Sequence, residues 1–248
     1  MAIKHIQTSH LVHDLKNPVN IIEAGARSLL EKQDRYGALN PRQEKVIRRL
    51  LRNALKIRTL TNSMLEVDMA AMGMVKTRDF VLGAVVKSAL MEVFDVVDPM
   101  VTEAIEEAHD FASLRRVLRD NDVILEAEDS HLNRTVRTDE TKLGLIITNL
   151  LSNALKFKQK TILLRCATDG ATVCVSVKDD GPGIPECYHQ QIFDQYFQCG
   201  QIEGFPVRGH GLGLAGAQAL TEALGGQLTL GCDSRGGAEF IVRIVCSK

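Results

Sequence analysis

The sequence predicts an α plus α/β fold with two parts: an antiparallel helical hairpin, followed by an α/β sandwich. Over residues 11–29 apolar side chains recur at alternating spacings of four and three residues, which is typical of a helix packed against other helices. A second helical pattern runs over residues 42–65. Beyond Gly73 short runs with strand-like alternation separate helical stretches. We therefore expect the two parts to be residues 1–72 and 73–248.

Each expected helix of the hairpin carries a seam of apolar residues. The first seam consists of Leu11, Leu15, Val19, Ile22, Ala26 and Leu29, and the second of Ile47, Leu50, Leu51, Ala54, Ile57, Leu60, Met64 and Leu65. Between them, Asn40 is expected to cap a helix that begins at Pro41. Two helices of about 28 residues each cannot enclose a core alone, so a homodimer forming a four-helix bundle is the economical solution.

The second part alternates between strand and helix patterns. A short strand leads into a helix over residues 79–93, and one further helix is expected over 100–118. Another helix starts at Asp139 or Thr141 and runs through "KLGLIITNLLSNALKF". The last helix is expected from about residue 211 to residue 224. The expected strands are residues 122–128, 161–168, 171–179, 227–232 and 238–246.

Composition excludes several classes of function. The 30 Lys and Arg residues nearly balance the 31 Asp and Glu residues, and Trp is absent, so nothing favours a nucleic-acid surface. No apolar run approaches the ~20 residues of a membrane helix, and the N-terminus lacks the apolar core of a signal peptide. The 6 cysteines form no CxxC pair, which favours reduced thiols in a cytoplasmic protein rather than a zinc site.

Two glycine-rich motifs suggest a bound ligand, although each is ambiguous alone. In "DDGPGIP", Asp179 follows a strand and could accept a hydrogen bond from an exocyclic amine, while Gly181 and Gly183 allow close approach of the backbone. An aspartate-glycine turn is more often only a turn. In "GHGLGLAGAQAL", the glycines open a helix whose N–H groups could hold phosphate, or they could serve close helix packing.

A third motif, "NLLSNALKF", places Asn149 and Asn153 on one helical face, with Lys156 three residues further on. An asparagine carbonyl can hold a Mg²⁺ that also takes phosphate oxygens, and the lysine can meet the same phosphates. The alternative is a helix that merely exposes its polar side.

Together, and in this order, the motifs resemble the nucleotide-binding boxes of the histidine protein kinases, in the superfamily shared with Hsp90-type chaperones, type II topoisomerases and MutL. "NLLSNALKF" resembles the N box, "DDGPGIP" the G1 box, "IFDQYFQ" the F box and "GHGLGL" the G2 box. The resemblance implies a Bergerat-type sandwich that binds ATP and Mg²⁺. Asn153 would coordinate Mg²⁺ with help from Asn149, Lys156 would contact phosphate, and Asp179 would bind the adenine amine.

The resemblance also implies a lid over ATP, spanning roughly residues 198–208. Phe193 and Phe197 would anchor this lid, and Arg208 is a candidate contact of the γ-phosphate. The remaining cofactor-binding residues implied by the G1 and G2 boxes are Gly181, Gly183, Gly209, Gly211, Leu212, Gly213 and Leu214.

The N-terminal stretch "HDLKNP" resembles the H box that carries the phospho-acceptor histidine of this family. At ~100° per residue, His13 lies roughly 160° from the seam residue Leu15 and should face solvent. Asp14 can hold the imidazole tautomer and take its proton. Asn17 completes a pattern that, in the family, orients a water molecule for dephosphorylation, and Pro18 would let the helix bend. His10 and His5 lack the following acid and proline.

The sequence thus predicts the core of a two-component sensor histidine kinase, which is autophosphorylated on His13 and passes the phosphoryl group to an aspartate of a response regulator. The alternatives are a protein dominated by phosphatase activity, an ATP-binding scaffold, and an ATPase akin to the chaperones or MutL; the helical part argues against the last. Twelve residues precede His13, so the signal is expected from a sensor domain or protein outside this chain. Residues 95–120 exceed the link usual in the family, and we expect an extra helix there that pads the sheet or contacts a partner.

Overall fold

The computed structural model describes residues 2–71, 75–194, 197, 212–231 and 236–246, with the backbone alone at residues 2–16, 56, 59–60 and 62–71. The chain divides into two compact units, residues 1–68 and 69–248. Each unit is described by itself.

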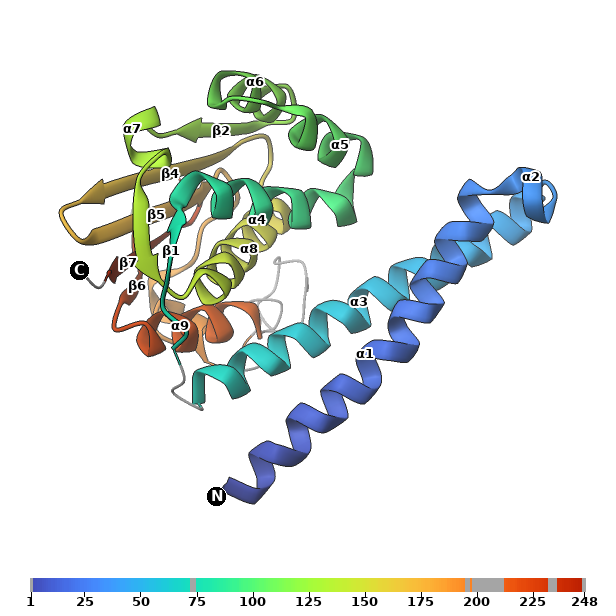
Figure 1. Ribbon diagram of the computed structural model, residues 1–248, viewed down its shortest axis with the longest axis horizontal. Helices are drawn as coiled ribbons and strands as arrows, with labels where there is room; N and C mark the ends of the chain where they lie inside the picture. The colour runs from blue at the N-terminus through green and yellow to red at the C-terminus, as the bar shows by residue number, and fades with distance from the viewer. Residues whose placement is uncertain (1, 72–74, 195–196, 198–211, 232–235, 247–248) are drawn as a thin grey trace. The chain divides into compact units, whose positions relative to one another are not determined.

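The first unit is a helical hairpin (Figure 1). Its elements are α1 (Ala2–Glu31), α2 (Gln33–Tyr36) and α3 (Pro41–Ala71). The predicted cap of the second long helix is confirmed: Asn40 Oδ1 accepts hydrogen bonds from the N–H groups of Arg42 at 3.0 Å and Gln43 at 2.9 Å. Helix α1 continues through Pro18.

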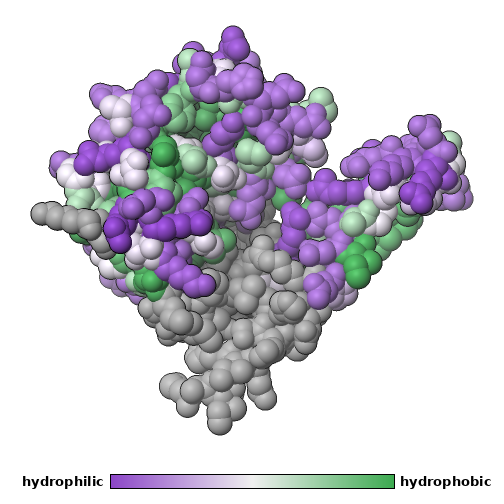
Figure 2. Space-filling model, viewed as in Figure 1, coloured by the Kyte–Doolittle hydropathy of each residue, from purple (hydrophilic) through white to green (hydrophobic). Residues whose placement is uncertain are grey.

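The predicted seams pack only partly within one hairpin. Val19 and Ala26 are buried, but Ile22 is 48% exposed. Its neighbour Glu23 is buried instead, and the Glu23 carboxylate accepts two hydrogen bonds from Arg58 of α3, both at 2.9 Å. Several apolar side chains therefore remain exposed, and green patches interrupt the hydrophilic surface of the hairpin in Figure 2. The large exposed ones are Ile21, Ile22, Val46, Leu50 and Ile57.

The second unit contains two sheets among its described residues. A two-stranded antiparallel sheet joins β1 (Arg78–Val81) to β3 (Thr135–Thr138). The larger sheet has the strand order β2-β4-β5-β7-β6, in which β2 is parallel to β4 and the other neighbours are antiparallel. Its strands are β2 (Val123–Glu126), β4 (Ile162–Asp169), β5 (Thr172–Asp179), β6 (Gln227–Gly231) and β7 (Glu239–Val245).

Three helices form the second layer of the sandwich (Figure 1). They are α4 (Leu82–Val97), α8 (Glu140–Phe157) and α9 (Gly213–Ala223). Alternate residues of β4 are buried beneath them, as the period of a strand with one covered face requires. The core between the layers includes Ile146 and Leu150 of α8 and Ile162 and Val175 of the sheet, all with 0% exposure. The predicted α/β sandwich is confirmed.

The extra stretch forms two helices rather than the one that we expected. Helices α5 (Pro99–Glu107) and α6 (Phe111–Asp120) are separated at Asp110, which caps α6 in a reciprocal capping box with Ser113. A capping signal of the form D-x-x-S inside a helical pattern marks this break. The inner side chains Val101, Ile105, Leu114 and Leu118 belong to the hydrophobic core, so the pair does pad the fold. In Figure 2 the surface over these helices is mostly hydrophilic. The short helix α7 (Asp129–Leu132) and strand β3 were not predicted.

Candidate nucleotide-binding site

Asp179 is the last residue of β5 and one of the buried acidic residues, with 3% exposure. Its Oδ1 accepts hydrogen bonds from the backbone N–H groups of Gly181 at 2.8 Å and Ala238 at 3.4 Å. Burial raises the pKa of the Asp179 carboxyl, and the two N–H donors only partly oppose this effect. Such a buried acceptor at the end of a strand is suited to a donor group of a ligand.

Glycine is required around Asp179 because backbone segments meet there. A side chain at Gly181 would collide with the carbonyl oxygen of Phe157, the last residue of α8. Gly183 has a φ of +75°. Gly237, with a φ of +81°, lies directly against the Asp179 backbone, and its N–H donates to the carbonyl of Gly181 at 3.0 Å. Sequence reasoning missed Gly237, although the pair Gly236-Gly237 ahead of the last strand was a signal.

Helix α8 carries the three polar residues that the sequence singled out. Of the two predicted starts, Asp139 and Thr141, the structure has the first: Asp139 caps the helix, and its Oδ1 accepts from the N–H of Lys142 at 3.1 Å. Asn149, Asn153 and Lys156 are all half-buried, and burial lowers the pKa of the Lys156 ammonium. Spacings of four and three residues place them on one side of the helix.

The start of α9 lies beside this polar side of α8. A Cβ added to Gly213, the first residue of α9, would lie 3.4 Å from Oδ1 of Asn149. Leu212, which precedes the helix, is buried, and Leu214 packs against the core. The structure therefore brings the α9 N-terminus, whose free N–H groups favour anions, close to Asn149.

Two predicted aromatic anchors are packed, while other predicted residues cannot be placed. Phe193, in the 3-10 turn η2 (Gln191–Phe193), contacts Phe240 of β7 edge-on, with 6.3 Å between the ring centroids. Phe197 packs near Tyr188, with 5.7 Å between the ring centroids. Tyr188 is the last residue of the 3-10 turn η1 (Glu186–Tyr188). Arg208, Gly209 and Gly211, together with most of the proposed lid, lie outside the described residues.

The stretch "HDLKNP", which resembles the H box, lies in the middle of α1. The backbone of His13 and Asp14 is helical, but their side chains lie outside the described part of the chain. Asn17 and Pro18 are both exposed.

An open cavity of about 460 Å³ lies at a different place in the α/β unit. Its walls include Arg134 and Arg137 around β3, Gly170 at the turn between β4 and β5, and Cys246. Because Asp169 pairs with Thr172 at the turn and Ile162 pairs with Asp179 at the opposite end, this cavity and Asp179 are separated by the length of the β4–β5 hairpin. The cavity is therefore distinct from the residues that the sequence singled out.

The polar side of α8 offers amide oxygens and an ammonium group. Among the described residues there is no group of three or more His, Cys, Asp or Glu that could hold a metal ion. Amide oxygens such as those of Asn149 and Asn153 suit a Mg²⁺ that also keeps phosphate oxygens and water as ligands. The donor set therefore fits a magnesium ion that arrives with phosphates.

Two family descriptions match the chain. Residues 4–71 match the His Kinase A (phospho-acceptor) domain, and residues 138–247 match the histidine kinase-, DNA gyrase B- and HSP90-like ATPase domain.

No helix in the described part of the chain is long and apolar enough to cross a membrane.

The chain is also similar to curated sensor proteins. The chain is 27% identical to the sensor histidine kinase YkoH of Bacillus subtilis, over 88% of this chain and 42% of YkoH. It is also 27% identical to the aerobic respiration control sensor protein ArcB of Escherichia coli, over 95% of this chain and 28% of ArcB. The chain thus spans less than half the length of these relatives.

The fold resembles that of solved histidine kinase structures. The full-length ShkA structure in complex with AMPPNP aligns with a TM-score of 0.66 and 23% identity, over 98% of this chain and 46% of ShkA. The histidine kinase AdeS of Acinetobacter baumannii aligns with a TM-score of 0.56 and 15% identity, over 95% of this chain and 98% of AdeS. The α/β unit is thus an ATP-binding domain of the histidine kinase type, preceded by a phospho-acceptor domain.

Proposed function

Because the chain belongs to the sensor histidine kinases of two-component systems, we propose that it transfers the γ-phosphoryl group of ATP to His13. Residues 1–72 are the dimerisation and phosphotransfer domain in this proposal, and residues 73–248 are the catalytic domain. The observation that carries it is the convergence of Asp179, the polar side of α8 and the start of α9 in the domain that follows a histidine-bearing helix.

The adenine and the phosphates occupy different parts of the proposed site. The buried Asp179 accepts a hydrogen bond from the adenine amine. For this the carboxyl must be ionised or, if it is protonated, must present its acceptor oxygen to the amine. Lys156 and the α9 N-terminus hold the phosphates. The backbone and apolar parts of the site comprise Gly181, Gly183, Phe193, Phe197, Gly209, Gly211, Leu212, Gly213 and Leu214, with Arg208 as the contact of the γ-phosphate.

Asn153, assisted by Asn149, would hold the Mg²⁺ ion. When bound there, Mg²⁺ would help to neutralise the charge that develops on the transferred phosphoryl group. The chain contributes the side-chain oxygens of Asn149 and Asn153, which lie four residues apart on α8. It also holds Lys156 on the same helix, in a partly desolvated environment.

His13 is the nucleophile in this proposal because a neutral imidazole nitrogen is available near its ordinary pKa of about 6.5. Asp14 holds the ring tautomer and takes the proton that the ring loses as the new N–P bond forms and the bond to ADP breaks. Asn17, which is exposed, could orient a water molecule for dephosphorylation of the partner. A phosphatase-dominant protein is therefore the second candidate function.

The partners follow from the same proposal. The exposed side chains of Ile22, Leu50 and Ile57 support a homodimer in which two hairpins form a four-helix bundle. The molecular mass in solution would test this. The second partner is the receiver domain of a response regulator, and the signal comes from a sensor domain or protein. We place the reaction in the cytoplasm, in keeping with the free thiols of Cys166, Cys174 and Cys187.

Incubation with γ-labelled ATP and Mg²⁺ tests the proposed function. We expect an acid-labile, base-stable label on the wild type that His13→Gln abolishes, because only this histidine has the acid and proline of the H box. His10→Gln is the matched control and should keep the label. A label that survives in His13→Gln would contradict the assignment. ATP binding without any label would favour the phosphatase function or an ATP-binding scaffold, and it would make Asn17 the next residue to test.

A further inference from the structure

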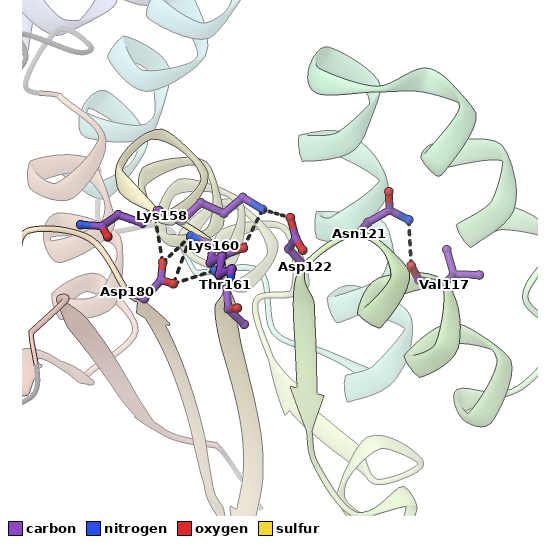
Figure 3. A network of polar contacts seen from close by, with 8 residues as sticks. Val117, Asn121, Asp122, Lys158, Lys160, Thr161 and Asp180 are labelled. Carbon is purple, nitrogen blue, oxygen red and sulfur yellow. Dashed lines mark hydrogen bonds and ion pairs between the residues drawn. The ribbon is translucent and has the colours of Figure 1, made fainter.

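Asp180, the residue after Asp179, has no part in the proposed function. Its carboxylate accepts hydrogen bonds from three consecutive backbone N–H groups: Gln159 at 2.8 Å, Lys160 at 3.0 Å and Thr161 at 2.9 Å (Figure 3). Desolvation alone would raise the pKa of Asp180, but these N–H groups bring it below its usual value. Successive N–H groups form a nest for an anion, so the Asp180 carboxylate is charged at neutral pH.

The N–H groups that Asp180 binds belong to the connection between α8 and β4. Helix α8 ends at Phe157, and β4 begins at Ile162, which pairs with Asp179. The carboxylate thus ties the exit of the helix that carries Asn153 and Lys156 to the loop that begins with Asp179.

A second contact joins the same two segments one residue further along. Gly181 lies against Phe157, so closely that a side chain at this position would meet the Phe157 carbonyl oxygen. The N–H of Gly181 in turn donates to Asp179 Oδ1 at 2.8 Å. Asp180 and Gly181 therefore both link the end of α8 to Asp179. Asp180 does so through hydrogen bonds to its charged carboxylate, and Gly181 through its backbone.

The connection is also held from the side of β2. Lys158 Nζ lies 3.1 Å from Oδ2 of Asp122 and donates to the carbonyl of Lys160 at 3.3 Å (Figure 3). The carbonyl of Asp122 accepts from the N–H of Ile162 at 2.9 Å. Residues 158–162 are thus held both by Asp122 and by Asp180.

We propose that Asp180 is a positioning residue for the nucleotide: it fixes the distance between the adenine acceptor Asp179 and the phosphate-binding side of α8. This inference rests on the proposed ATP site. A ligand that spans both parts depends on that distance, whereas one that meets only Asp179 does not. Loss of the Asp180 carboxylate should therefore weaken a long ligand much more than a short one.

Calorimetric titration of the full chain with Mg-ATP and with adenosine measures this difference. For Asp180→Ala we expect the Kd of Mg-ATP to rise about tenfold, since small misplacements of binding groups are costly. The Kd of adenosine should change less than about twofold. Asp180→Asn keeps one acceptor oxygen without the charge, so it should lie between Asp180→Ala and the wild type, and it tests the proposal if Asp180→Ala fails to fold.

Asp110→Ala is the matched control. Asp110 is another exposed carboxylate whose pKa is lowered by hydrogen bonds from Ser113, but it caps α6 and has no contact with residues 157–161. It should leave both Kd values unchanged, whatever its effect on thermal unfolding. Wild-type Mg-ATP affinity in Asp180→Ala, or equal losses for the two ligands, would overturn the inference. A wild type that does not bind Mg-ATP would instead remove the proposed site, and the inference with it.

Discussion

The helical hairpin and the α/β unit each bury a carboxylate, and they treat it differently. Glu23 of α1, 7% exposed, bonds Arg58 at 2.9 Å and Arg27 at 3.2 Å. Asp179, 3% exposed, is bonded by backbone N–H groups among the residues that the structure describes, and burial raises its pKa. Removing Glu23 would leave two guanidinium groups without the carboxylate that they bond, whereas the buried Asp179 carboxylate, with its raised pKa, is suited to a donor group of a ligand.

Of the substitutions that test this comparison, Asp179→Asn should have the largest effect, on the affinity for Mg-ATP. The amide cannot accept from the adenine amine in the same way as the carboxylate, so we expect the Kd of Mg-ATP to rise about 100-fold, equivalent to ~2.8 kcal/mol. The same change removes a buried charge, so the unliganded domain should not lose stability. Calorimetry and thermal unfolding measure the two properties separately. A variant that unfolds more easily and still binds ATP would reverse the roles assigned to the two carboxylates.

Glu23→Ala should have a smaller effect, and the property that it changes should be stability rather than ATP affinity. Removing the acid leaves Arg58 and Arg27 near each other in a partly buried place, so we expect a loss of about 2 kcal/mol in the stability of the hairpin. Chemical denaturation followed by circular dichroism measures it. ATP affinity should stay at the wild-type value.

Glu44→Ala is the control for Glu23→Ala. Glu44 forms an ion pair with Arg48 at 2.6 Å on the surface of α3. Such a pair is worth only about 0.3–0.5 kcal/mol. Equal losses for the two variants would mean that the burial of Glu23 contributes nothing.

The pH dependence of stability should show the smallest effect, with opposite signs for two adjacent residues. The folded-state pKa of Asp179 is raised, so its ionisation destabilises the fold, and stability falls as pH rises from the ordinary aspartate pKa to the raised one. The folded-state pKa of Asp180 is lowered, so its contribution is present above the ordinary pKa and is lost as pH falls through the lowered one.

Denaturation of Asp179→Asn and Asp180→Asn over a pH series tests this. At neutral pH the first variant should be more stable than the wild type and the second less stable. Both differences should shrink in acid. Differences that do not change with pH would show that packing, rather than charge, separates the variants from the wild type.

The sequence predicted those features that depend on local patterns. The cap at Asn40, the start of α8 after Asp139 and the alternation in β5 are each visible within a few residues, and the structure has them. The resemblance of the boxes to those of the histidine kinases also predicted the family and the α/β sandwich. The comparisons and the structure confirm both. The roles of the individual site residues stay predictions.

Features that depend on tertiary contacts could not be read from the sequence. The burial of Glu23 depends on Arg58, which is 35 residues away. Gly237 is needed because β7 brings it against Asp179, and the role of Asp180 depends on the loop after α8. Strand β3, which was not predicted from the sequence, is defined by its pairing with β1.

The place of β7 in the sheet has a consequence for the order in which the α/β unit forms during synthesis. This strand, residues Glu239–Val245, follows all the other described strands in the chain, yet it lies between β5 and β6. It also brings Ala238, whose carbonyl accepts from the N–H of Asp179 at 3.0 Å. While the ribosome still holds this segment, β5 lacks a neighbour and Asp179 lacks one of its bonds. The nascent chain can therefore form helix α1 before the proposed nucleotide site around Asp179 is complete.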